Sequence, residues 1–157
     1  MKSIHSIIAA LGLAFVLPAP ASAASGDPEQ IIYRFPGVLD NGGAAVTGVA
    51  TVFHCTNFSG VTETLRFVVR NFNTTVVANL TQSIAHLATV TVATHDTGVY
   101  AESVNLGTGP VGQGTAAIAA TSVNVICTAM TIDAANSKPD GVALRGIRFS
   151  PVPGSQE

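Results

Sequence analysis

The chain has 157 residues, of which 47% are hydrophobic and only 10% charged, and its formal net charge is −2. Typical soluble domains are about 25% charged. The few basic residues are scattered, so the composition excludes a basic nucleic-acid-binding surface. The high apolar content also excludes an intrinsically disordered chain.

The first 23 residues have the pattern of a cleaved signal peptide. Lys2 supplies a positive start, residues 7–17 form an apolar run, and Pro18 and Pro20 precede Ala-Ser-Ala at 21–23. The apolar run is too short for a membrane-spanning helix, which needs about 20 residues. We therefore expect residues 1–23 to be removed on export to the periplasm or the cell exterior, leaving no membrane span in the mature chain.

Cleavage after Ala23 would leave residues 24–157, and their number, 157 − 23 = 134, suits a single domain. Loss of Lys2 would change the formal charge to 6 − 9 = −3. Thr, Val, Ala, Asn and Gly dominate, whereas the long charged side chains that cover helix surfaces are sparse. Because β-branched residues favour strands, we expect one all-β domain, with residues 24–30 and 150–157 as loose tails.

Alternating polar and apolar residues, separated by turn signals, predict the strands in chain order. They are expected at residues 31–35, 46–56, 61–71, 76–81, 86–94, 99–104, 116–132 and 142–149, with 116–132 forming one long strand or two. Segment 61–71 is expected to form a hairpin with segment 46–56 and to bury Leu65, Phe67 and Val69 on one face.

The last predicted strand changes parity along its length. Val142 and Leu144 share one face, whereas Ile147 and Phe149 share the other, so we expect a β-bulge at Gly146. Turn signals every about 8–12 residues predict a two-sheet antiparallel β-sandwich of about seven to nine strands. The expected topology is immunoglobulin-like or pilin-like, and a closed barrel is the alternative.

Two cysteines, Cys55 and Cys127, remain in the mature chain, each within a predicted strand. In an oxidising compartment an even number of cysteines indicates a disulfide. Strand residues two apart share a face, so Cys55 should lie with Phe53, and Cys127 with Val125, in one buried layer. Immunoglobulin domains also carry one disulfide, but they bury a tryptophan beside it, and this chain has no tryptophan.

The histidines His54, His86 and His95, with Asp96, are the candidate metal ligands, because imidazole and carboxylate groups suit zinc or copper. Their spacing matches no ligand motif, and neighbouring strand residues such as His95 and Asp96 point to opposite faces. We therefore expect no metal site and no bound cofactor.

Two further motifs suggest chemistry. The tripeptide Asp-Thr-Gly at 96–98 occurs in aspartic proteases, but it is also common in turns, and the second element that family requires is broken at Arg145. The glycine-rich segment 107–114 does not lead from a strand into a helix, as a phosphate-binding loop does. We therefore expect no catalytic residues.

The most favoured function is an exported, non-enzymatic β-sandwich domain with a structural or partner-binding role. Its partner would be another exported protein or a cell-surface component. The alternative is a fibre subunit, because the chain resembles pilin-type subunits in size, leader, disulfide and Thr/Ala/Gly/Val composition. It departs from them in its widely separated cysteines and its Pro-Gly-Ser-Gln-Glu end. A small secreted hydrolase or metal-binding protein is the second alternative.

Overall fold

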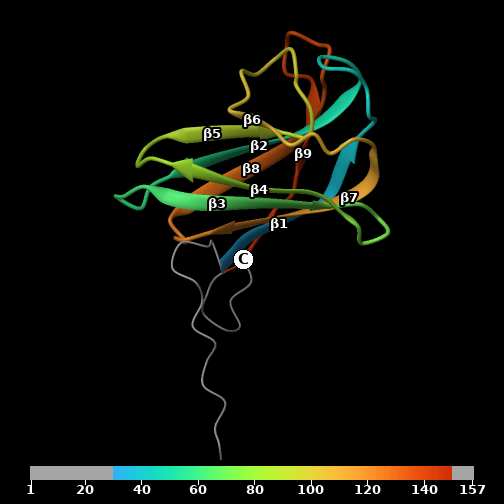
Figure 1. The fold of residues 1–157 in the computed structure, drawn as a ribbon. Helices are drawn as coiled ribbons and strands as arrows, with labels where there is room; N and C mark the ends of the chain where they lie inside the picture. The colour runs from blue at the N-terminus through green and yellow to red at the C-terminus, as the bar shows by residue number, and fades with distance from the viewer. Residues whose placement is uncertain (1–29, 150–157) are drawn as a thin grey trace, which may run out of the picture.

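Two five-stranded sheets packed face to face make up residues 30–149, the part of the chain that the computed structural model describes (Figure 1). In chain order the strands are β1 (Gln30–Asp40), β2 (Val49–Asn57), β3 (Glu63–Arg70), β4 (Val76–Ile84), β5 (Thr89–Ala93), β6 (Val104–Asn105), β7 (Val111–Ala120), β8 (Val125–Asp133), β9 (Gly141–Leu144) and β10 (Ile147–Arg148). Sheet A has the order β10-β1-β7-β3-β4, and sheet B has the order β6-β5-β2-β8-β9.

The sheets confirm the predicted all-β sandwich and do not close into a barrel. Residues 30–149 contain no helix, and every strand pair is antiparallel except β5 with β6. The predicted signal peptide, residues 1–23, lies outside the described residues, and so do the predicted tails apart from Gln30. That residue already belongs to β1, so the tail prediction was wrong at this one position.

The core between the sheets follows the predicted alternation. Leu65, Phe67 and Val69 of β3 are all buried, as expected. The rings of Phe35, Phe53 and Phe67 form a chain from sheet A to sheet B and back, with centroid separations of 5.8 and 6.2 Å. Such aromatic contacts stabilise beyond the area that they bury, so they anchor the two layers to each other.

The expected hairpin between the second and third strands was wrong, because β2 and β3 belong to different sheets. Asn57 at the end of β2 is buried, and its side-chain amide donates hydrogen bonds to the carbonyls of Val61 (2.7 Å) and Ile84 (3.0 Å). Its Oδ1 accepts from the Ser59 N–H at 2.8 Å. These bonds hold the loop across the edge of the sandwich, so that the chain crosses from sheet B to sheet A.

Similar crossings explain two other differences from the expected strands. Segment 116–132 forms two strands, one of the two predicted possibilities, but β7 and β8 lie in different sheets. The parity change at Gly146 is also a crossing, because β9 lies in sheet B and β10 in sheet A, so the predicted β-bulge was wrong. A Cβ on Gly146 would lie 2.3 Å from Phe35 Cε1, so only glycine lets the chain pass this close to the core.

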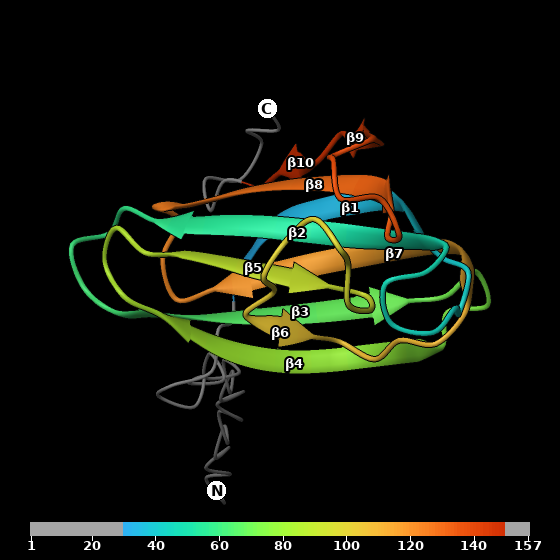
Figure 2. The same ribbon diagram turned by 90° about the horizontal axis from the view of Figure 1, so that it is seen from above.

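The remaining differences concern strand ends. β1 continues to Asp40, five residues beyond the predicted end at Phe35, with shifts of register around Pro36 and Val38. Of the strand predicted at 99–104, only Val104 pairs within β6, because the preceding residues form a loop over sheet B (Figure 2).

A disulfide joins Cys55 of β2 to Cys127 of β8, which are directly opposite in sheet B with a Cα–Cα distance of 4.1 Å. Both cysteines belong to the core cluster together with Phe53 and Val125, as the alternation predicted. The bond lies within one sheet, whereas the disulfide of immunoglobulin domains joins the two sheets. Its position therefore separates this sandwich from the immunoglobulin pattern.

Candidate functional site

Several long loops lie together at one end of the sandwich, on the right in Figure 2, and we call this the loop end. It comprises residues 41–48 after β1, 71–75 after β3, 106–110 after β6 and 134–140 after β8, together with the start of segment 94–103, the rest of which lies over sheet B. Loops on a rigid sandwich are where binding residues are commonly found. The loop end is therefore the candidate region for a binding site.

A buried acid–histidine pair fastens two of these loops. Asp40, the last residue of β1, is 2% exposed, and its Oδ2 lies 2.7 Å from His95 Nδ1. Asp40 Oδ1 accepts a hydrogen bond from the Gly42 N–H, and His95 Nε2 lies 3.0 Å from the carbonyl oxygen of Thr47. The pair thereby holds loop 41–48 against the segment after β5.

Backbone hydrogen bonds connect three loops at the same end. The Val46 N–H donates to the Asp96 carbonyl at 2.9 Å, and the Gly98 N–H donates to the Ala134 carbonyl at 2.8 Å. The Ala134 N–H in turn donates to the Gly48 carbonyl at 2.7 Å. Loops 41–48, 94–103 and 134–140 therefore form one connected surface.

Val46 stands out on this surface. Its φ is +57°, a conformation that costs a β-branched residue free energy, and its side chain is 45% exposed. Strained residues persist where the surrounding contacts over-determine them, and they gather at binding sites. The Val46 N–H bond to Asp96 is the contact that holds this residue in place.

A second polar cluster covers the outer face of sheet B under the loop before β6. Glu102 Oε1 accepts hydrogen bonds from the backbone N–H of Thr97, at 3.0 Å, and from its hydroxyl. The Tyr100 ring packs edge-on against His54, with centroids 4.6 Å apart, and its hydroxyl lies 3.5 Å from Met130 Sδ. The cluster explains why these residues form a loop rather than the predicted strand.

His54 is held in this cluster by a 3.1 Å contact between its Nδ1 and Thr91 Oγ1. Burial lowers the pKa of His54 below its usual value of 6.5, and the nearby charge of Glu102 opposes part of this shift. The half-buried ring is therefore held mainly in its neutral form at neutral pH.

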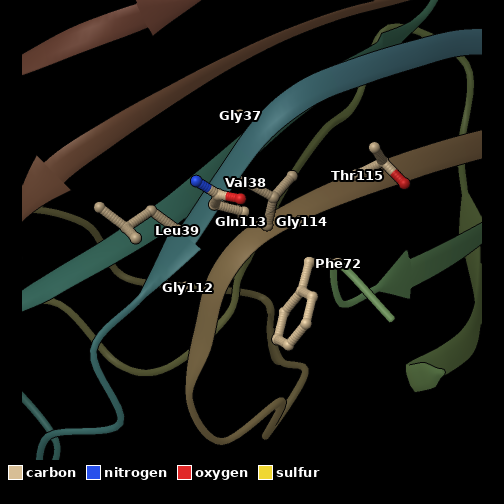
Figure 3. A pocket seen from close by; sticks show the side chains of 8 residues that line it. All are labelled: Gly37, Val38, Leu39, Phe72, Gly112, Gln113, Gly114 and Thr115. Carbon is tan, nitrogen blue, oxygen red and sulfur yellow. The ribbon is translucent and has the colours of Figure 1, made fainter. Parts of the chain in front are cut away.

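A pocket of about 410 Å³ opens on sheet A at the loop end (Figure 3). It is lined by Gly37, Val38 and Leu39 of β1, by Gly112, Gln113, Gly114 and Thr115 of β7, and by Phe72 of the β3–β4 turn. None of these side chains is charged. The Phe72 ring, 73% exposed, stands beside the glycine-containing part of β7. The arrangement offers an aromatic face, accessible backbone and two polar side chains.

The turn that carries Phe72 is well supported. The Thr74 N–H donates to the Asn71 carbonyl at 3.0 Å, and the Asn71 side-chain oxygen accepts from the Phe72 N–H at 2.8 Å. Arg70 Nη1 donates to the Thr74 carbonyl at 2.9 Å. The exposed ring is thus presented by a fixed turn, which reduces the conformational entropy lost on binding.

The histidines that the sequence analysis weighed as candidate metal ligands lie apart. His54 is in the middle of sheet B, His95 is buried at the loop end, and His86 is in the β4–β5 loop at the opposite end, where its Nδ1 accepts from the Gly60 N–H. Asp96 Oδ1 instead accepts from the Asn105 amide at 3.0 Å. Within residues 30–149, no group of three or more His, Cys, Asp or Glu side chains could hold a metal ion.

The structure shows where the other two sequence motifs, the Asp-Thr-Gly tripeptide and the glycine-rich segment, lie. Thr97 of the Asp-Thr-Gly tripeptide bonds to Glu102, and Gly98 is tied to Ala134. The glycine-rich segment 107–114 runs through a loop into β7, and its last three residues line the pocket.

Sequence reasoning missed Asp40 and Phe72, the central residues of the loop end. Asp40 was visible only as the first residue of an Asp-Asn-Gly-Gly turn, and nothing in the sequence paired it with His95, which lies 55 residues away. Phe72 lay in a polar break between strands. A lone aromatic residue among asparagine and threonine is the one signal that could have indicated it.

Comparison of the chain with protein-family descriptions, curated protein sequences and solved structures found no match. Among the described residues, no helix is long and apolar enough to cross a membrane.

Proposed function

We propose that this chain is an exported, non-enzymatic β-sandwich domain that binds a neutral cell-surface glycan at its loop end. The pocket beside Phe72 is the observation that carries this proposal. Sugar rings combine an apolar face with hydroxyl groups. The pocket offers a matching pair, an exposed aromatic ring and the polar groups of Gln113 and Thr115.

The absence of charge in the pocket lining defines the ligand class. The lining side chains are apolar or neutral polar, so the lining itself offers a charged ligand no ion pair to replace its lost hydration. Gly112 is exposed and leaves its backbone accessible beside the ring, so a flat ring can approach it closely.

Loop rigidity supports a binding role. The Asp40–His95 pair and the backbone bonds from Val46, Gly98 and Ala134 fix the loops before any ligand arrives. Binding to a surface that is already ordered costs less conformational entropy. These same contacts use His95 for structure, which supports a domain without catalysis.

Export is supported by the leader pattern of residues 1–23 and by the buried disulfide. N-terminal analysis of exported protein should find Ala24, or a residue next to it, as the first residue. An intact Met1 on exported protein would contradict this part of the proposal.

Binding is tested with an array of neutral oligosaccharides and the variant Phe72→Ala. The control is Phe58→Ala, which removes a ring that is also exposed, 50%, but lies in the β2–β3 loop at the opposite end. Phe72→Ala should weaken binding about fivefold or more, since stacking of a ring on an aromatic side chain contributes about 1–3 kcal/mol. Equal losses in both variants, or no glycan bound by the folded wild type, would overturn the proposal.

A fibre subunit is the second candidate, and one observation favours it: β4 is a long, uncharged edge of sheet A. A fibre, however, needs a head-to-tail contact between two different surfaces. Electron microscopy of concentrated protein would show filaments if this candidate is right.

A further inference from the structure

Strand β4 forms one free edge of sheet A along its whole length (Figure 2). Its nine residues, Val76–Ile84, contain no charged side chain and no proline. The other edge strands are short: β6 and β10 have two residues each, and β9 has four. Proteins usually protect long edges with charges, prolines or bulges, because unpaired backbone groups recruit another strand. β4 lacks the first two of these protections, and its register shift against β3 lies at its start, at Val77, so residues 78–84 form a regular edge.

The register shows which backbone groups of β4 face outward. The Thr121 N–H donates to the Thr64 carbonyl, so the even-numbered residues of β3 point their backbone groups toward β7. The odd-numbered residues of β3 therefore bond to β4, where they oppose Ala78, Leu80, Gln82 and Ile84. Beyond the register shift at Val77, the odd-numbered residues of β4 therefore direct their N–H and C=O groups to solvent; these are Asn79, Thr81 and Ser83.

We propose that two copies of this chain associate through β4, antiparallel, about a two-fold axis at Leu80. This register places Asn79 of each copy opposite Thr81 of the other. These are the residues whose backbone groups are unpaired, so the two edges satisfy each other reciprocally. The two sheets A become one continuous sheet.

Side chains and charges suit a second copy. Leu80, half-buried at the edge of the core-facing side, meets its own copy at the axis and loses exposed apolar surface. No charged residue meets another in the interface, because β4 has none. A charged peptide would find no opposite charge along β4. The β4 edge of a second copy is itself uncharged along its full length, so it matches this edge.

The arginines of the neighbouring strand do not oppose this pairing. Arg66 of β3 lies opposite Thr81, one strand in from the edge. In the dimer it is three strand spacings from its copy, about 14 Å at about 4.8 Å per strand. That distance exceeds the screening length of about 8 Å in physiological salt. The interface does not include the part of the pocket lining that lies on β1 and β7. The dimer proposal therefore does not depend on glycan binding.

Cross-linking tests the register directly. In this arrangement the two Leu80 residues form a directly opposed pair without mutual hydrogen bonds, whose Cα atoms lie about 4.5 Å apart. Cys55 and Cys127 are bridged in the same kind of directly opposed position. Purified Leu80→Cys should therefore form a covalent dimer under mild oxidation. The control Gln82→Cys lies on the same face but opposes Ala78 of the second copy, so it should remain largely uncross-linked.

Analytical ultracentrifugation of wild type and two variants at Thr81 gives a second test. Thr81→Pro removes an N–H that faces solvent in the monomer, so β3 keeps its bonds. It deletes two hydrogen bonds from the symmetric dimer and should raise the dimer dissociation constant about tenfold or more. Thr81→Val keeps the N–H and should dimerise like wild type.

The proposal is overturned if wild type stays monomeric up to millimolar concentration, or if Leu80→Cys and Gln82→Cys cross-link equally. Equal dimerisation of Thr81→Pro and Thr81→Val also contradicts it. Circular dichroism checks the fold of each variant. If Thr81→Pro does not fold, the cysteine pair decides alone.

Discussion

Breaking the bond between Cys55 and Cys127 should lower the stability of the domain by a predictable amount. The bond closes a loop of 72 residues. The entropy that this closure removes from the unfolded chain corresponds to about 4 kcal/mol at 25 °C. With an unfolding entropy of about 2.1 cal/mol/K per residue, that loss lowers the Tm of a domain of this size by about 15 °C.

The sheet should survive the loss of the bond. Strands β2 and β8 remain paired from Val49 with Asp133 to Asn57 with Val125. We therefore expect reduced protein to keep its far-ultraviolet circular dichroism spectrum at 25 °C and to melt earlier. Urea unfolding of oxidised and reduced protein gives the free-energy difference.

The double variant Cys55→Ala/Cys127→Ala is the control, because a reductant should not change its stability. A difference between oxidised and reduced wild type below about 1 kcal/mol would refute the loop-closure reasoning. So would loss of the β-sheet spectrum on reduction, because the sheet would then depend on the bond.

Three further changes have definite expected outcomes. Asp40→Asn removes the charged partner of His95 and should cost about 2 kcal/mol in urea unfolding; an unchanged midpoint would contradict the buried pair. Because the pKa of His54 is lowered on folding, the unfolded state binds more protons below pH 6.5. Stability should therefore be complete above pH 6.5 and fall as the pH drops below it, and His54→Gln should lose less between pH 7.5 and 5; an equal loss contradicts this. Gly146→Ala places a Cβ against a core ring and should cost about 1–3 kcal/mol. The control Gly112→Ala, which meets nothing within 4 Å, should be nearly neutral, and equal costs would refute the close approach.

The sequence allowed the fold class and the buried face of single strands to be predicted, because alternation is a local property of the chain. Leu65, Phe67 and Val69 are buried as their spacing indicated. Cys55 and Cys127 share the core with their neighbours for the same reason.

Which sheet a strand joins could not be predicted in the same way. The hairpin expected between β2 and β3 has the same alternation as the observed crossing, and only the buried amide of Asn57 distinguishes them. The parity change at Gly146 was visible, but a bulge and a change of sheet produce the same pattern in sequence. The close approach of Gly146 to Phe35 joins residues that are far apart in the sequence, so no local pattern indicates it.

The candidate site depended on long-range contacts even more. Asp40 and His95 meet because β1 and β5 end at the same side of the sandwich, and no local pattern reports that meeting. The pocket likewise combines Phe72 with Gly112 and Gly114, which come from separate segments.

Chemical-shift mapping of the isotope-labelled, oxidised domain with a neutral oligosaccharide tests the glycan-binding proposal most directly. We predict that the perturbed amides are those of Phe72 and of residues 112–115, with smaller changes in loop 41–48 and none near Phe58 at the opposite end. Saturable changes confined to the opposite end, or none at any neutral glycan while the domain remains folded, would contradict it.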